Sequence, residues 1–319
     1  MGRNDQMKVY INRLPVDGPW GGGNQWITSA HKLLPKLGHS ICQANLRLRS
    51  GPPQNFADVV LIAGLDGDMC LSAEQLVSWT YHGLGPRHDG GTRLIIRVNE
   101  NDARKGTTGV DKRLVELSGY MDGTVFVSRW LQEYFVKLGW KCTNNTVIKN
   151  GVDSSIFYPR EKFYDGKIHI ASHHWSNNPG KGFDIYEEID KFVEQDSRFA
   201  FTYIGRDRGT FKNTRVVAPL YGHDLGNELG KHDVYVSASR WDPGPNHIAE
   251  SIFCELPTYV HENGGGCVEF AGQDHVYKNW EELEQLLLDR QFAANSTSFD
   301  DWQSCIRQYV EFVENITRN

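Results

Sequence analysis

The chain lacks any apolar run long enough to cross a membrane, and its first residues lack the apolar core of a signal peptide. It also lacks an excess of positive charge, since 34 lysines and arginines stand against 40 aspartates and glutamates. Nucleic-acid binding requires a basic face that neutralises phosphates, so we expect no nucleic-acid partner. We expect a cytoplasmic protein with no membrane span.

The six cysteines are scattered, with no C-x-x-C pair and no histidine cluster at zinc spacing. This pattern predicts reduced thiols and gives no expectation of a bound metal. The sequence Asp66-Gly-Asp68 follows a predicted strand, and paired carboxylates suit Mg²⁺ or Mn²⁺. Because Asp-Gly-Asp is also ordinary turn chemistry, a metal site at Asp66 and Asp68 is kept only as an alternative.

Strand-like apolar runs alternate with helix-like amphipathic runs along the whole chain. The predicted strands are residues 8–11, 59–63, 94–98, 124–128, 167–172, 199–205, 215–220, 234–239 and 258–261. Such alternation predicts an α/β protein with parallel sheets flanked by helices, one sheet in each half. An Asn-Gly pair and a proline at 150–160 interrupt the pattern. We therefore predict two Rossmann-like domains, residues 1–153 and 154–298, followed by an amphipathic helix at 299–319.

Two loops between a strand and a helix carry groups suited to an anion. Gly22 and Gly23 belong to a triple-glycine loop, where bare backbone N–H groups can approach an anion at a helix N-terminus. The spacing differs from the G-x-G-x-x-G of dinucleotide sites. Lys181, after His173 and His174, would aim its ammonium at a similar place and neutralise a diphosphate leaving group. Tight turns and packing explain the glycines and histidines equally well.

The segment 239–269 carries the strongest signal. Asp242 and Asn246 are predicted in the loop after a strand, and Glu250 in the first turns of the next helix. Carboxylates placed there accept hydrogen bonds from sugar and ribose hydroxyls, and the amides of Asn246 and His247 face phosphates. Helix capping explains Asp242 or Asn246 alone, but not the whole arrangement with two glycine-rich turns downstream. The segment therefore predicts a sugar-nucleotide site.

The chain resembles the retaining GT-B glycosyltransferases of family 4, the glycosyl transferases group 1, over nearly its whole length. Residues 150–159 match the family's interdomain pattern N-G-V-D-x-x-x-F-x-P, and Lys181 with Gly182 resembles its donor-phosphate lysine motif. Asp242-x7-Glu250 stands in place of its E-x7-E element. The first glutamate of that element is an aspartate here, and the basic residue usual some six positions before the lysine is absent.

The resemblance implies a GT-B fold, with two parallel sheets facing across a cleft and the C-terminal helix crossing back to the first domain. It implies retaining, metal-independent transfer of a hexosyl unit from a UDP- or GDP-sugar to a carbohydrate or glycoconjugate hydroxyl, with no required cofactor. Glu250 would bind the ribose, Asp242 the donor sugar and Lys181 the diphosphate. The candidate acceptor contacts are Arg97, Asn99 and Asp102.

Other hypotheses stay open from the sequence. Several substitutions touch the predicted site, so the chain could be a degenerate sugar-nucleotide-binding protein without turnover. Within enzymes, the alternatives are inverting transfer and a metal-dependent transferase that uses Asp66 and Asp68. The donor base, the sugar, the acceptor, the linkage and the oligomeric state are not specified by the residues.

Overall fold

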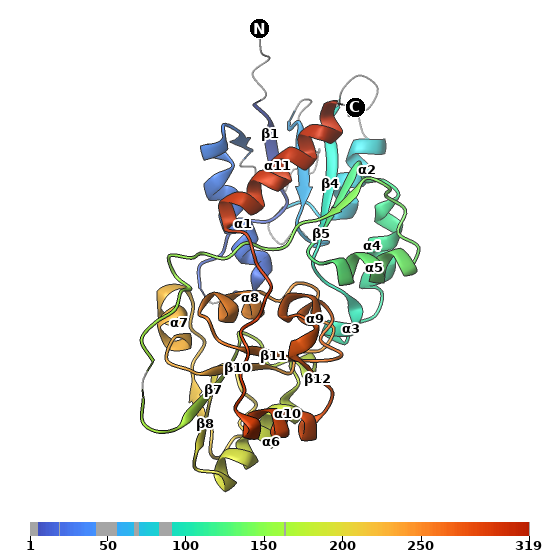
Figure 1. Cartoon of the computed structure of the whole chain (residues 1–319). Coiled ribbons are helices and arrows are strands. Elements are labelled where there is room, and N and C mark those ends of the chain that lie inside the picture. The colour runs from blue at the N-terminus through green and yellow to red at the C-terminus, as the bar shows by residue number, and fades with distance from the viewer. Residues whose placement is uncertain are drawn as a thin grey trace.

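A computed structural model describes residues 6–18, 20–42, 56–66, 70–82, 91–162 and 164–318. Its strands form two six-stranded parallel sheets, stacked end to end in Figure 1. We call the elements up to β6 the N-terminal half and those from β7 onward the C-terminal half. The GT-B architecture expected from the resemblance is confirmed in this arrangement.

The N-terminal sheet has the spatial order β2 (Ser40–Ile41), β1 (Lys8–Ile11), β3 (Val59–Ile62), β4 (Arg93–Val98), β5 (Gly123–Phe126) and β6 (Asn145–Val147). The helices of this half are α1 (Gly22–Leu33), η1 (Pro35–Leu37), α2 (Ala73–His82), α3 (Asp102–Lys105), α4 (Val110–Ser118) and α5 (Arg129–Lys137).

The C-terminal sheet has the order β12 (Val276–Tyr277), β11 (Thr258–His261), β10 (Val234–Ser237), β7 (Ile168–His174), β8 (Phe199–Gly205) and β9 (Arg215–Val217). Its helices are η2 (Pro179–Lys181), α6 (Phe183–Gln195), α7 (Gly222–Leu229), α8 (Asn246–Phe253), α9 (Gly266–Ala271), η3 (Gln273–His275) and α10 (Trp280–Asp289). The last helix, α11, spans Trp302–Arg318.

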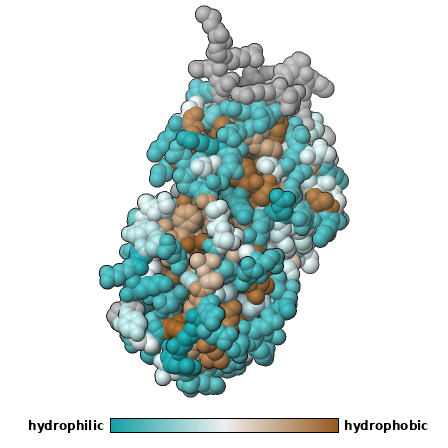
Figure 2. Space-filling view, in the orientation of Figure 1, coloured by the Kyte–Doolittle hydropathy of each residue, from teal (hydrophilic) through white to brown (hydrophobic). Residues whose placement is uncertain are grey.

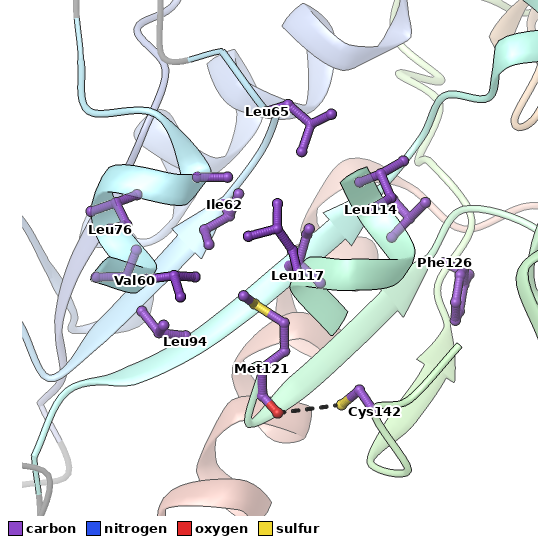
Figure 3. Packing of buried hydrophobic residues seen from close by; sticks show 14 of the residues in the cluster. Val60, Ile62, Leu65, Leu76, Leu94, Leu114, Leu117, Met121, Phe126 and Cys142 are labelled. Atoms are coloured by element: carbon purple, nitrogen blue, oxygen red, sulfur yellow. Dashed lines mark hydrogen bonds between the residues drawn. The ribbon is translucent and has the colours of Figure 1, made fainter. Parts of the chain in front are cut away.

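Strands such as β3 and β10 are largely apolar because both faces of the sheets are covered, whereas β7 carries three histidines and a serine. In β3, Val60 and Ile62 belong to the core under α2 and α4, whereas Val59 and Leu61 belong to the core on the opposite face. Figure 3 shows side chains of α2 and α4 pointing toward the strand residues of the first core. The two-sided burial explains why these strands are recognisable in the sequence as continuous apolar runs.

Helix α11 belongs to the core of the N-terminal half although it follows the C-terminal sheet. Its buried residues, among them Ile306 and Tyr309, pack with Val59 and Trp26. Figure 1 shows α11 lying across the N-terminal half beside α1. The segment before it is held at Val152, which forms a parallel bridge with Asp301. The crossing-back helix expected from the resemblance is confirmed.

All the strands predicted from apolar runs are present. The pattern does not predict β2, β6 and β12, which are only two or three residues long and leave little periodicity to detect. Within the described ranges, none of the helices is both long and apolar enough to cross a membrane. On the face drawn in Figure 2, hydrophobic residues are scattered among hydrophilic ones over the coloured part of the chain.

We predict that Ile306→Ala lowers the free energy of unfolding by roughly 2–5 kcal/mol, because it leaves a cavity in the core of the N-terminal half. Gln303→Ala, on the exposed side of the same helix, should change it by about 0.5 kcal/mol or less. Urea unfolding followed by tryptophan fluorescence measures both. Equal effects of the two substitutions would show that α11 does not complete this core.

Candidate functional site

A cavity of about 390 Å³ lies between the two halves, where the carboxyl ends of β7 and β10 face the glycine-rich loop after β1. This is the edge at which open parallel sheets bind ligands. The predicted site residues in its lining are Gly22, Lys181, Asp242, Asn246, His247 and Glu250. The structure therefore brings together predicted residues that are more than 200 positions apart.

Lys181 and Asp242 form a buried ion pair at the bottom of this cavity. Lys181 Nζ donates to Asp242 Oδ2 over 3.1 Å, and both side chains are about 5% exposed. Lys181 ends the short helix η2, and Gly182 follows with a φ of +77°. A side chain at Gly182 would clash with the carbonyl oxygen of Ala238, so only glycine lets η2 pack this closely on the end of β10.

A third charged group, Arg104 of the N-terminal half, lies beside this ion pair. Arg104 Nε lies 3.7 Å from Asp242 Oδ2, the oxygen that also accepts from Lys181. Burial by itself would raise the pKa of Asp242, but the Lys181 ammonium and the Arg104 guanidinium hold that pKa well below its ordinary value. Burial lowers the pKa of Lys181, and Asp242 offsets part of that effect. Asp242 is therefore an anion held by two cations.

Asp242 does not cap helix α8. The N-cap of α8 is Pro245, which makes no side-chain capping bond. Instead, the loop of Asp242 rests on the glycine-rich turn that precedes α9, because the Gly266 N–H donates to the Asp242 carbonyl over 2.7 Å. A Cβ at Gly266 would lie 2.9 Å from the carbonyl oxygen of Pro243. The downstream glycines thus support the loop from behind by close backbone contact.

Glu250 projects from α8 and is bonded to both halves. Gln25 Nε2 donates to Glu250 Oε1 over 3.1 Å, and His173 Nε2 lies 2.9 Å from Glu250 Oε2. Asn246, one turn earlier on α8, donates from Nδ2 to Gln25 Oε1 over 2.7 Å. A single side chain of α1 therefore bridges Asn246 and Glu250, two of the polar residues that α8 presents to the cavity.

His174 and His247 also line the cavity, with ring centroids 4.8 Å apart. His174 Nε2 lies 2.8 Å from the Tyr186 hydroxyl, and His247 Nε2 lies 2.9 Å from the Ser237 hydroxyl. Burial, followed by the nearby Lys181 ammonium, lowers the pKa of both imidazoles well below 6.5. Both rings are neutral at pH 7 and add no charge to the cavity.

The predicted acceptor residues lie outside the lining of this cavity. The Arg97 guanidinium is buried over the Trp26 ring and donates to Asn150 Oδ1 over 2.8 Å. Asp102 accepts from the backbone N–H groups at the start of α4. Asn99 lies beside Gly23, which is in α1 and also outside the lining.

Asp66, the first carboxylate of the Asp66-Gly-Asp68 motif, is also outside the cavity lining. Asp66 has a 77% exposed side chain and pairs with Arg113 over 3.2 Å. Asp68 lies outside the described residues. Across the ranges that the structure describes, no group of three or more His, Cys, Asp or Glu side chains is placed to hold a metal ion.

Two cavity residues carry no recognisable sequence signal. Gln25 is an ordinary polar position on an amphipathic helix, and Arg104 follows a loop in a helix of only four residues. Both residues enter the cavity because they contact the C-terminal half of the chain, and a local sequence pattern does not predict such a contact. The aromatic pair Trp20 and Trp175 likewise meets across the halves, with ring centroids 5.4 Å apart.

We predict that Asp242→Asn lowers the free energy of unfolding by roughly 3–5 kcal/mol, because it leaves Lys181 buried without its counter-charge. The double variant Asp242→Asn/Lys181→Met should recover most of this loss, since only the more exposed Arg104 stays uncompensated. Asp184→Asn, which breaks the exposed pair with Arg240, is the control and should cost about 1 kcal/mol or less. A double variant no more stable than Asp242→Asn would contradict the assignment.

Stability should also fall in mild acid. The unfolded chain binds protons at His174 and His247 near pH 6.5, whereas the folded protein does so only at lower pH. The contribution of each neutral histidine to the free energy of unfolding is therefore complete above about pH 6.5. Below that pH it is lost at up to about 1.4 kcal/mol per pH unit. His247→Gln should flatten the slope of unfolding free energy against pH between 6.5 and 5.5. The exposed His223→Gln should leave it unchanged; equal slopes in both variants would refute the prediction.

No protein-family model and no curated protein matches this sequence. Several solved structures match its fold. HepE of Anabaena, in complex with UDP and glucose, is 13% identical with a TM-score of 0.71, over 97% of this chain and 100% of that one. Sucrose-phosphate synthase of Thermosynechococcus elongatus is 11% identical with a TM-score of 0.68, over 98% and 99%. A glycosyltransferase of Rickettsia africae is 14% identical with a TM-score of 0.64, over 99% and 100%. The chain shares one complete two-sheet fold, GT-B, with these proteins.

Proposed function

We propose that this protein is a glycosyltransferase that moves a hexosyl unit from a UDP-sugar to a hydroxyl of a carbohydrate or glycoconjugate acceptor, with retention and without a metal. The observation that carries the proposal is the cavity between the sheets, where Lys181, Asp242 and Glu250 converge. UDP is preferred to GDP because HepE, which has the same fold, binds UDP and glucose. Sugar specificity is proposed at the level of a hexose only.

The polar groups of the cavity match the parts of such a donor. Lys181 would bind the diphosphate, together with the N-terminal amides of α8 at Asn246 and His247. Glu250 would accept hydrogen bonds from the ribose, exchanging the Gln25 amide for ribose hydroxyls. Asp242 would accept from hydroxyls of the donor sugar. The Lys181 ammonium and the Arg104 guanidinium hold the pKa of Asp242 well below its ordinary value, so this carboxylate is an anion that can accept from sugar hydroxyls.

The protein contributes to the transfer mainly by positioning the two substrates and by stabilising the charge on the leaving group. The bond between the anomeric carbon and the diphosphate oxygen breaks, and its electron pair leaves with the diphosphate. The acceptor oxygen bonds to the same face of the sugar, and its proton passes to the departing phosphate oxygen. Lys181 stabilises the charge that grows on that leaving group, and buried charges act strongly where water is excluded.

Two other functions differ from this one by measurable outcomes. A sugar-nucleotide-binding protein without turnover would bind UDP but release none from a UDP-sugar. A metal-dependent transferase using Asp66 and Asp68 would require Mn²⁺ and lose activity in Asp68→Ala. The exposed pairing of Asp66 with Arg113, away from the cavity lining, gives no support to that second alternative.

We predict that the wild-type protein, incubated with an acceptor screen and a UDP-hexose in the presence of EDTA, releases UDP in a coupled assay. Lys181→Ala and Glu250→Ala should each lower kcat/KM by about 100-fold or more, because each loses a buried charged contact to the donor. The exposed Lys191→Ala and Glu262→Ala are matched controls and should stay within about twofold of wild type. A wild-type protein that binds UDP but releases none from the UDP-hexose would contradict the proposal that it is an enzyme.

A further inference from the structure

Arg104 reaches the bottom of the cavity from the half of the chain opposite to the other charges. It belongs to α3 in the N-terminal half, whereas Lys181 and Asp242 follow strands of the C-terminal sheet. Its guanidinium lines the cavity and is 3.7 Å from the carboxylate that Lys181 binds. The three charged groups therefore form one cluster built from both halves.

The position of Arg104 is fixed by its backbone. The Arg104 N–H donates to Asn101 Oδ1 over 2.7 Å, and Asn101 Nδ2 donates to the Trp241 carbonyl over 3.1 Å. On the other side, a Cβ at Gly180 would lie 2.8 Å from the Arg104 carbonyl oxygen. The turn of α3 thus packs directly on η2 and on the loop of Asp242. Arg104 is delivered to the cluster by docking between the halves.

The cluster has one positive charge in excess, because two cations face a single carboxylate. Among the residues that the structure describes, Asp242 is the carboxylate that pairs with Arg104, and Arg104 Nε is shielded from water without a hydrogen-bond acceptor. His174 and His247, which also line the cavity, are neutral at pH 7 and add no further charge. The Arg104 side chain as a whole is 23% exposed, but a buried N–H without an acceptor is costly, and an anion in the cavity would accept from it.

We propose that Arg104 is the second cation of the donor-phosphate site, supplied by the N-terminal half, and that it neutralises the diphosphate together with Lys181. The inference rests on the proposed function. The diphosphate gains a negative charge when the sugar leaves it, so a fixed guanidinium stabilises the leaving group more than the intact donor. Its planar fork can also hold two phosphate oxygens at once. The phosphate site is complete only when the two halves are docked.

Calorimetric titration with UDP and with uridine tests the proposal, because only UDP carries phosphates. Arg104→Gln should weaken UDP binding by roughly 10- to 100-fold and leave uridine binding unchanged, since charged hydrogen bonds contribute about 1.5–3 kcal/mol. Arg104→Lys, which keeps the charge without the fork, should fall between. Lys105→Gln is the matched control: it removes the same charge from the same short helix, where Lys105 pairs with Glu100 away from the cavity lining.

Steady-state kinetics provide a second test, because an arginine with a purely structural role would not change kcat and KM for the donor by different amounts. Arg104→Gln should lower kcat more than it raises KM for the donor, because the charge on the leaving group is largest in the transition state. UDP affinity and kcat of Arg104→Gln within twofold of those of Lys105→Gln would overturn the proposal. In that case a wild type that still binds and releases UDP leaves the proposed function intact. A wild type that binds no UDP would instead overturn the proposed function, and this inference with it.

Discussion

The buried ion pair between Lys181 and Asp242 is the constraint on which the rest of the cavity depends. Two ions with about 5% of their side chains exposed are stable only if their geometry is fixed. Gly182 allows η2 to reach the end of β10, and the glycines before α9 hold the Asp242 loop from behind. These close backbone contacts place a charged cluster at the carboxyl edge of the C-terminal sheet, where an incoming diphosphate would meet it.

The N-terminal half completes this edge. Arg104 adds a cation to the cluster, and Gln25 bridges Asn246 and Glu250 on α8. Helix α11 ties the halves together, because it begins beside Gly151 and packs into the N-terminal core. Several contacts that join the halves, those of Arg104 and Gln25 among them, end on residues of the proposed donor site, whereas Glu269 contacts Trp130 and Lys149 outside the cavity lining. Docking of the halves and assembly of the site are therefore one structural event.

Much of this could be predicted from the sequence, because it is encoded locally. Apolar runs predict the strands that are buried on both faces, and loops after strands predict Lys181, Asp242 and Glu250, which the cavity brings together. Gln25 and Arg104 could not be predicted, since their role comes from contacts between the halves. The resemblance also selected Asp102, in the loop after a predicted strand, but its carboxylate accepts from the first N–H groups of α4.

The central claim is that this cavity binds a nucleoside diphosphate on a charged cluster contributed by both halves. A crystal structure of the protein with UDP tests it most directly. The account predicts phosphate oxygens within hydrogen-bond distance of Lys181 Nζ and the Arg104 guanidinium, with the ribose hydroxyls on Glu250 in place of Gln25. Nucleotide bound elsewhere, or bound here with Arg104 turned away from the phosphates and Gln25 still on Glu250, would contradict it.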